Sequence, residues 1–168
     1  TWPTSVRKLA SKYSASPLVL SIGGSGEGSG LQANKDVTQT FFKLDDSEKD
    51  AQLALLIDGM ADTDRMICFT NTKRRVDYLA KSLWADGFGA SAIHGGRIQA
   101  EREEALRKFK TNEWPLMFAT DVAARGLDIP GVDWVVQFDA PQDPAAFVHR
   151  VGRTARMGRA GSALLFLS

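Results

Sequence analysis

Short apolar runs alternate with amphipathic stretches from residue 37 to the end of the chain, and this alternation constrains the fold more than any other feature. The apolar runs have the length and composition of β-strands. They span residues 38–44, 66–69, 90–93, 116–119, 134–138 and 163–167. Between them, apolar side chains recur at helical spacing, as in Val76, Leu79, Ala80 and Leu83. Strands that alternate with helices favour an α/β fold with a mainly parallel sheet and helices on both faces.

The first 36 residues have a different pattern. Residues 1–22 contain a helix-like stretch with apolar side chains at Val6, Leu9 and Tyr13, and then a short apolar run at 18–22. Residues 23–30 read GGSGEGSG, a composition typical of a flexible linker. We therefore expect residues 1–22 to be the end of a preceding domain, residues 23–36 to be an interdomain linker, and residues 37–168 to form the α/β domain.

Composition excludes several classes of protein. Apolar residues make up 43% of the chain and charged residues 24%, which is the mixture of a soluble globular protein. No apolar run is long enough to span a bilayer, so we expect no membrane partner. The net charge is only +1. Any surface for nucleic acid must therefore come from local clusters of Lys and Arg.

The single cysteine also bears on location and metal binding. Cys68 lies inside an apolar run, where a buried and unreactive thiol is expected. The sequence shows neither a signal peptide nor a cluster of Cys and His with metal-ligand spacing. It therefore predicts an intracellular protein with no structural metal of its own.

Polar and glycine residues gather directly after three of the expected strands. They are Thr70-Asn71-Thr72, His94-Gly95-Gly96-Arg97 and the stretch from Thr120 to Asp128. Ligands of doubly wound sheets bind beyond the carboxyl ends of the strands. Gly95 and Gly96 would let the backbone approach a ligand closely, and they lead into a helix whose N-terminus favours phosphate. The alternative is a tight turn between strand and helix, and the residues alone leave both interpretations open.

The next helix carries polar residues on its apolar face. Gln99 and Arg102 lie three residues apart and continue the stripe of Ala105, Leu106 and Phe109. An arginine at the first turn of this helix can reach the strand ends and contact a phosphate. It can instead extend its aliphatic stem along the edge of the core.

The stretch HRVGRTARMGRAG, residues 149–161, is the strongest local signal. It spaces Arg150, Arg153, Arg156 and Arg159 at intervals of three among glycines. Arginine binds phosphate oxygens in pairs, and nearby glycines make room for a ligand, so the pattern favours a polyanion. A solvated basic turn is the alternative.

The sequence lacks the phosphate-binding loop with which many α/β domains hold nucleotides. No GxxxxGK[ST] motif and no acidic box of the Asp-Glu-x-Asp kind occur in the chain. Arginines directed at phosphate without that loop indicate a domain that completes the nucleotide site of another domain, as an arginine finger does.

Four stretches resemble the motifs of one family. They are MICFTNTKRR (66–75), AIHGGRIQAERE (92–103), ATDVAARGLDIPGVDWVVQFDAP (119–141) and HRVGRTARMGR (149–159). In order and spacing they are similar to the second, C-terminal RecA-like domain of DEAD-box ATP-dependent RNA helicases. The resemblance covers nearly the whole chain, because residues 1–3 resemble the segment directly after the Ser-Ala-Thr motif of the first domain. It implies a RecA-like three-layer domain, with residues 1–22 as the end of the first RecA-like domain.

The resemblance implies roles at an ATP site. Arg153 and Arg156 would be arginine fingers that reach across an interdomain cleft to the γ-phosphate. Asp128 would accept a hydrogen bond from the nucleotide ribose, and His149 would help to couple the domain to the acidic box of the preceding one. The implied cofactor is ATP with Mg²⁺, whose metal is held mainly by that preceding domain.

The resemblance also implies a path for RNA. Positions that would hold the single-stranded backbone are Gly95, Gln99, Arg102, Thr120, Arg125, Thr70 and Asn71. The implied mechanism is a switch, in which ATP and RNA close two domains, a short duplex separates, and hydrolysis reopens the cleft. RNA, the preceding domain and possible regulatory proteins are the expected partners.

Two departures and two rival functions accompany this resemblance. Ala155 stands where the family more often has Gly, and residues 23–30 are richer in Gly than a typical interdomain connection; neither departure removes a functional group. A helicase or translocase of another class, acting on DNA, is the first rival, and the wording HRVGRTAR argues against it. A non-catalytic module that binds RNA or a partner is the second, although Arg153, Arg156 and Asp128 are all present.

Overall fold

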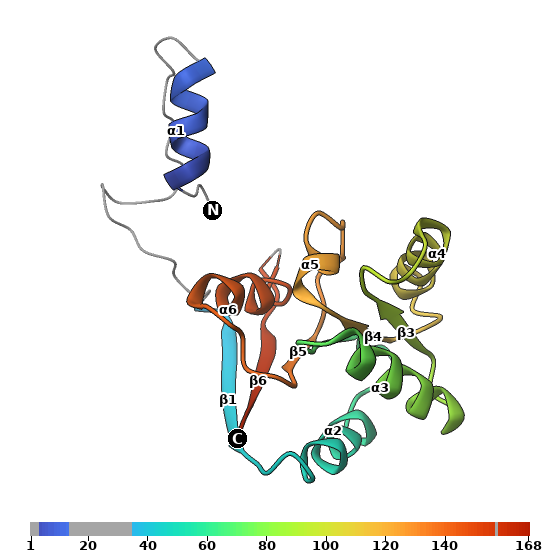
Figure 1. Cartoon of the computed structure of the whole chain (residues 1–168). Coiled ribbons are helices and arrows are strands. Elements are labelled where there is room, and N and C mark those ends of the chain that lie inside the picture. The colour runs from blue at the N-terminus through green and yellow to red at the C-terminus, as the bar shows by residue number, and fades with distance from the viewer. Residues whose placement is uncertain (1–3, 14–34, 157) are drawn as a thin grey trace. The chain divides into compact units, whose positions relative to one another are not determined.

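The chain divides into two compact units, residues 1–30 and residues 31–168. The computed structural model describes residues 4–13, 35–156 and 158–168 (Figure 1). In the first unit, the helix α1 (Thr4–Tyr13) confirms the helical pattern expected there. The apolar run at 18–22 and the Gly/Ser stretch at 23–30 lie outside the described residues.

The second unit is built on one six-stranded sheet in which every pair of neighbours is parallel. The strands lie in the order β1-β6-β5-β2-β4-β3. Their bounds are β1 (Val37–Lys43), β2 (Met66–Phe69), β3 (Ala90–Ile93), β4 (Leu116–Ala119), β5 (Trp134–Gln137) and β6 (Gly161–Leu167). All six strands expected from the sequence are present, so the predicted α/β fold with a parallel sheet is confirmed.

Helices cover both faces of this sheet (Figure 1). They are α2 (Lys49–Asp58), α3 (Lys73–Ala85), α4 (Gln99–Lys110), α5 (Asp121–Ala124) and α6 (Pro144–Val151). One core cluster joins α2 and α3 to the sheet through residues such as Leu53 and Leu79. The other joins α4, α5 and α6 to the opposite face through Phe109, Ala123 and Val151. The result is a three-layer domain.

The alternation of side chains along β2 explains the two clusters. Met66 and Cys68 belong to the cluster under α2 and α3, whereas Ile67 and Phe69 belong to the one under α4, α5 and α6. Successive residues of a strand point to opposite faces, so a strand covered on both sides is apolar throughout. The Cys68 thiol is fully buried, and burial raises its pKa, as expected for an unreactive cysteine.

Capping residues fix where two helices begin. The Thr72 side chain accepts a hydrogen bond from the backbone N–H of Arg75 at the start of α3. The Asp143 carboxylate accepts one from Ala146 at 2.7 Å, and Pro144 occupies the first turn of α6. Such caps satisfy backbone donors that the first turn leaves without a partner. The starts of α3, after β2, and of α6, after β5, are therefore fixed by side chains of the preceding loops.

The two aromatic residues near the end of α3 contact the rest of the domain to different extents. Trp84 is 54% exposed, and its ring meets Trp114 edge-on at 5.3 Å between centroids. Phe88 packs against the core. None of the helices in the part of the chain that the structure describes is long and apolar enough to cross a membrane.

Candidate functional site

A buried arginine organises the carboxyl edge of the sheet. Arg150, on α6, is 1% exposed. Its guanidinium donates two hydrogen bonds to the Asp121 carboxylate, at 2.8 and 2.7 Å, and one to the backbone oxygen of Asp139 at 2.6 Å. A further bond reaches the Asn71 side chain at 3.0 Å, and the guanidinium lies over the Phe69 ring. The Arg150 guanidinium is therefore buried and hydrogen-bonded within the domain. The four evenly spaced arginines do not form one phosphate-binding set.

Thr70 and Asn71 belong to the same network. Thr70 is fully buried, and its hydroxyl donates to the backbone oxygen of Thr72 at 3.0 Å. The Asn71 amide donates to the backbone oxygen of Ala140 at 3.0 Å while its oxygen accepts from Arg150. These bonds tie the loop after β2 to the loop after β5. The Thr70 and Asn71 side chains, both predicted to contact RNA, are thus hydrogen-bonded to the loops around them.

The turn after β3 presents glycine backbone to solvent. Gly95 and Gly96 are exposed, and the helix α4 begins three residues later at Gln99. The Arg102 guanidinium donates to the Gln99 side-chain oxygen, and the Gln99 amide donates to Glu103 at 2.7 Å. Gln99 is exposed and Arg102 is half-buried. The structure thus brings two predicted RNA-contacting side chains together at the start of α4.

Thr120 and Arg125 mark the two ends of α5. Thr120 precedes the helix, and its backbone N–H donates to the backbone oxygen of Ile93 on the neighbouring strand at 3.2 Å. Arg125 comes after the helix and is exposed. Together with the turns after β2 and β3, they complete the polar carboxyl edge that the sequence predicts.

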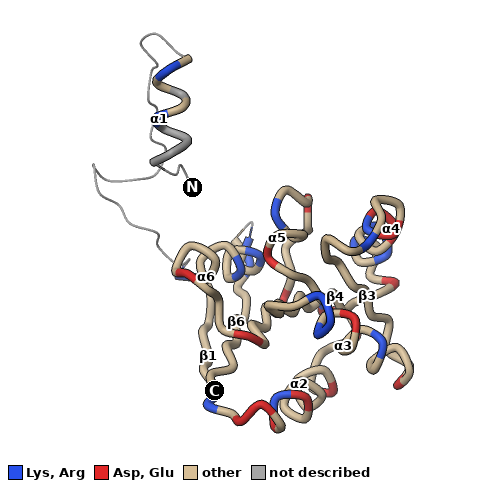
Figure 2. The backbone as a smooth tube through the Cα atoms, in the orientation of Figure 1, with Lys and Arg blue, Asp and Glu red and all other residues tan. Residues whose placement is uncertain are grey.

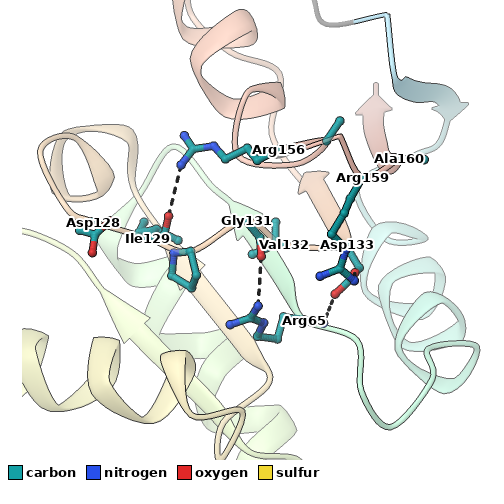
Figure 3. Close-up of a pocket in the computed structure, with 11 residues that line it drawn as sticks. Arg65, Asp128, Ile129, Gly131, Val132, Asp133, Arg156, Arg159 and Ala160 are labelled. Atoms are coloured by element: carbon teal, nitrogen blue, oxygen red, sulfur yellow. Dashed lines mark hydrogen bonds and ion pairs between the residues drawn. The ribbon is translucent and has the colours of Figure 1, made fainter.

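A pocket of about 300 Å³ lies at the opposite edge of the sheet (Figure 3). Its walls come from segments that directly precede β2, β5 and β6, which are neighbours in the sheet. The residues are Arg65, Asp128, Ile129, Pro130, Gly131, Val132, Asp133, Ala155, Arg156, Arg159 and Ala160. The sequence predicts Asp128 at the carboxyl edge, because it comes after β4 in the chain. The loop after α5 instead carries it back to the amino ends of the strands.

The two edges are well separated. A strand rises about 3.3 Å per residue, so the four residues of β5 alone place them roughly 13 Å apart. The residues predicted to hold RNA lie at one edge, and Asp128 and Arg156 lie in the pocket at the other. Sequence position after a strand does not distinguish these edges, since a loop can run back across the domain.

Arg153 and Arg156 project from the loop that ends α6. Arg156 is exposed, and its guanidinium donates to the backbone oxygens of Gly152 at 2.9 Å and Ile129 at 3.4 Å. Arg153 is half-buried. Burial lowers the pKa of its guanidinium, and the positive charge of Arg156 lowers it further. Two arginines held this close, with no carboxylate bonded to either among the described residues, favour an anionic ligand.

The loop that carries these arginines is fixed to the sheet. The buried Thr154 hydroxyl donates to the Val132 backbone oxygen at 2.6 Å, and the Val132 N–H donates to the Arg153 oxygen at 3.1 Å. A Cβ at Gly161 would lie 1.8 Å from the Thr154 hydroxyl, so only glycine fits there. The arginines therefore stand on a rigid base.

The remaining predicted residues are close to solvent. The Asp128 carboxylate lies 2.8 Å from the Lys110 ammonium, whose hydrogen bond and charge hold the pKa of this carboxyl below its usual value. His149 lies in the last turn of α6 and is half-buried. No group of three or more His, Cys, Asp and Glu able to hold a metal occurs among the residues that the structure describes.

Sequence reasoning missed Arg65. Its guanidinium donates to the Gly131 oxygen at 3.2 Å, and its backbone N–H donates to the Asp133 carboxylate at 3.0 Å. Arg65 directly precedes β2 and so lies at the amino edge of the sheet. The rule that ligands bind beyond the carboxyl ends of the strands does not lead to this edge. The adjacent Asp64-Arg65 pair before an apolar strand was the only local signal for it.

Charge is distributed in local clusters. Figure 2 shows basic residues at the end of α6, in the loop after α5 and on α4, with acidic residues between them. This pattern agrees with the net charge of +1. Local arginines, and not an overall basic surface, distinguish the two edges.

The sheet order, the three layers and the arginine-bearing loop define a RecA-like helicase domain. The family model described as helicase conserved C-terminal domain matches residues 48–158. The chain is 42% identical over 166 residues to DEAD-box ATP-dependent RNA helicase 46 of Arabidopsis thaliana, covering 99% of this chain and 25% of that protein. It is 41% identical over 167 residues to the ATP-dependent RNA helicase CshA of Listeria monocytogenes, covering 99% of this chain and 31% of that protein.

Solved structures of DEAD-box proteins have the same fold as this chain. A Saccharomyces cerevisiae Dbp5 variant bound to RNA and ADP BeF3 matches with a TM-score of 0.81 at 29% identity, over 99% of this chain and 43% of that one. The Escherichia coli DEAD-box protein SrmB, bound to regulator of ribonuclease activity A, matches with a TM-score of 0.72 at 35% identity, over 80% of this chain and 78% of that one. The chain therefore belongs to the DEAD-box RNA helicases and carries their C-terminal helicase domain. It spans about a quarter to a third of the length of these two curated relatives.

Proposed function

We propose that this domain supplies arginine fingers to an ATP site shared with a preceding helicase domain, and that it holds the backbone of single-stranded RNA. Coupling the two would let ATP hydrolysis drive local unwinding of RNA duplexes or remodelling of RNA–protein complexes. The observation that carries the proposal is the separation of two polar regions at opposite edges of one sheet. At one of them Arg153 and Arg156 have no carboxylate bonded to them among the residues that the structure describes.

The pocket and the arginine loop beside it fit a nucleoside triphosphate. Asp128 and Arg156 line the pocket, and Arg153 lies three residues before Arg156 on the same loop. Arg153 and Arg156 offer planar donors to phosphate oxygens, and the exposed Asp128 carboxylate can accept from ribose hydroxyls. The chain has no phosphate-binding P-loop, so the nucleotide and its Mg²⁺ would be held mainly by the preceding domain. Bound ATP supplies the phosphoryl group to be transferred to water. In small GTPases an arginine finger accelerates that transfer by about 10³ to 10⁵.

The carboxyl edge fits an RNA backbone. Exposed glycine backbone at Gly95 and the polar side chains of Gln99, Arg102, Thr120 and Arg125 can contact phosphate and sugar. Such contacts carry little sequence information, and the 2′-hydroxyl distinguishes RNA from DNA. Thr70 and Asn71 would shape this edge through their bonds to neighbouring loops. The bound relatives support the proposal, since Dbp5 is seen with RNA.

A short segment connects the two regions. It starts at Thr120 on the RNA side, runs through α5, and reaches Asp128 in the pocket. Domain closure around ATP and RNA together would make each ligand favour the binding of the other. His149, near the arginine loop, would contribute to the contact with the preceding domain. Regulatory proteins are expected partners, as the complex of SrmB with RraA suggests. We expect the protein to act inside the cell.

The test is ATP hydrolysis by a polypeptide that joins this chain to a preceding helicase domain. Rates are measured without nucleic acid, with single-stranded RNA and with DNA of the same sequence. We expect RNA to stimulate hydrolysis more than DNA, and Arg153→Ala to abolish the stimulated rate. Arg107→Ala is the matched control, because Arg107 is an exposed arginine on α4 paired with Glu104. RNA binding without any hydrolysis in the folded protein would leave a non-catalytic RNA-binding module.

A further inference from the structure

A buried histidine holds the glycine turn after β3. His94 is 5% exposed, so its ring is shielded from solvent. Its Nδ1 lies 3.1 Å from the Gly96 backbone nitrogen, and its Nε2 lies 2.9 Å from a carboxylate oxygen of Asp77 on α3. The residues proposed to contact RNA in this region are Gly95, Gln99 and Arg102, and His94 is not among them.

The two partners fix the protonation of the ring. The Gly96 N–H can only donate, so Nδ1 must accept and carries no proton. A neutral imidazole then carries its proton on Nε2, which donates to Asp77. The guanidinium of Arg97 also donates to Asp77, at 2.5 Å. Partial burial raises the pKa of the Asp77 carboxyl, but the hydrogen bonds from His94 and Arg97 outweigh it and leave that pKa below its usual value. The carboxylate is therefore charged and able to fix the ring.

The ring also determines which residue can occupy each position of the turn. A Cβ at Gly96 would lie 3.0 Å from Nδ1 and 3.1 Å from Cε1 of His94, so a side chain there would crowd the ring. A Cβ at Gly95 would meet only the flexible end of the Lys73 side chain, at 3.8 Å. Nothing within the described domain therefore requires glycine at 95, and the open space above it is available to a ligand.

From this geometry we infer that His94 is a positioning residue for RNA binding, which holds the Gly95–Gly96 backbone in the shape that admits a phosphate. His94 does not touch RNA. Its Nδ1 lone pair restrains the Gly96 N–H, Asp77 keeps the required tautomer, and Arg97 keeps Asp77 in place. This inference rests on the proposed RNA contact at the turn.

Two substitutions separate the two bonds of the ring. In His94→Asn the side-chain oxygen can take the place of Nδ1 and accept from Gly96, while the bond to Asp77 is lost. In His94→Gln the amide can take the place of Nε2 and donate to Asp77, while the acceptor for Gly96 is lost. Both variants replace the same buried imidazole with an amide side chain, so we expect similar losses of stability. Each variant therefore serves as the stability control for the other.

RNA affinity of the two-domain polypeptide is the first measurement. Losing one hydrogen bond to a restrained donor predicts an affinity about five- to tenfold weaker for His94→Gln, and His94→Asn should remain within about threefold of the wild type. ATP hydrolysis without RNA should be unchanged in both variants. Equal losses of affinity in the two variants, or losses that track their melting temperatures, would overturn the inference. Failure of the wild type to bind RNA would instead overturn the proposed function.

Backbone amide exchange of this chain gives a second readout that needs no RNA. The Gly96 amide should be protected from exchange with solvent in the wild type and in His94→Asn, and unprotected in His94→Gln. Nitrogen chemical shifts of the wild-type imidazole should show the tautomer with its proton on Nε2. A Gly96 amide that exchanges equally fast in all three proteins contradicts the inference.

Discussion

Two arginines of the same motif, Arg150 and Arg156, have opposite surroundings. Arg150 is buried and bonded to Asn71, Asp121 and Asp139, whereas the exposed Arg156 bonds, among the described residues, only to backbone oxygens. The first closes the carboxyl edge of the sheet. The second lies at the amino edge, where a ligand can reach it. Residue type and regular spacing therefore do not by themselves indicate a shared role.

The end of α6 creates this difference. Arg150 lies in the last turn of the helix, and its position on the helix directs it into the domain. Gly152 ends the helix, and the chain then takes an irregular path in which Ala155 has a φ of 51°. Arg153 and Arg156 lie on that path and not on the helix. Helical periodicity consequently stops being a guide to direction after residue 151.

The largest effect that we predict is a loss of ATP hydrolysis when the exposed Arg156 is replaced. Arg156→Ala should lower RNA-stimulated ATP hydrolysis of the two-domain polypeptide by about 10³ or more, because the transferred phosphoryl group loses a finger. The free energy of unfolding should change by less than about 1 kcal/mol, since the side chain is exposed. Arg156→Lys should not restore the rate, because an ammonium lacks the planar fork. A loss below about tenfold would remove Arg156 from the fingers.

Replacing the buried Arg150 should instead lower the free energy of unfolding. Arg150→Met leaves the Asp121 carboxylate without its main partner and should cost about 3–5 kcal/mol, measured by urea unfolding of the chain. Arg159→Met is the control, because Arg159 is exposed and lies 3.4 Å from Asp133; it should cost less than about 1 kcal/mol. Similar losses in the two variants would show that burial does not distinguish these arginines. Adding Asp121→Asn to Arg150→Met should recover part of the loss.

A third substitution tests whether the two edges bind different ligands. Gly95→Ala adds a methyl group that would meet only the flexible end of the Lys73 side chain, at 3.8 Å, and should leave stability within about 0.5 kcal/mol of the wild type. If RNA approaches this backbone, affinity for RNA should fall on the order of tenfold, which corresponds to about 1.4 kcal/mol. Nucleotide affinity without RNA should be unchanged. Unaltered RNA affinity, measured by titration of a labelled strand, would place the RNA away from Gly95.

The smallest predicted effect concerns the loop between the arginines. Ala155 adopts a left-handed backbone conformation that costs a residue with a Cβ roughly 1 kcal/mol. Ala155→Gly relieves this cost, but it loses a buried methyl and adds freedom to the unfolded chain. We expect a gain below about 1 kcal/mol in thermal or urea unfolding, with hydrolysis within about twofold of the wild type. A clear loss of stability would mean that methyl packing outweighs backbone strain.

Much of the fold could be predicted from the sequence. The apolar runs place each of the six strands within two residues of its observed bounds, because period and composition are local properties. Local turn chemistry likewise places Gly95 and Gly96 at the end of β3. For the site, the sequence puts Gln99 and Arg102 at the start of one helix, and the structure shows that they touch.

What failed depended on where loops run. Asp128 comes after β4 in the chain but lies at the amino edge, and Arg65, which lines the same pocket, was not predicted as a site residue. The spacing groups Arg150 with its neighbours in the motif, although its partners are distant. No local pattern reports the direction that a loop takes after its helix ends.

The sequence by itself determined the order of strands and helices, the motifs of a DEAD-box C-terminal domain and the absence of a P-loop. Only the tertiary structure decided which arginines are buried and which edge of the sheet each polar residue reaches. The physical reason is the separation along the chain of the residues that interact. Strand and helix periodicity depends on residues a few positions apart, whereas Arg150 is bonded to Asp121 and Asn71, 29 and 79 residues away. Burial of a charge depends on such distant partners, and only the folded chain brings them together.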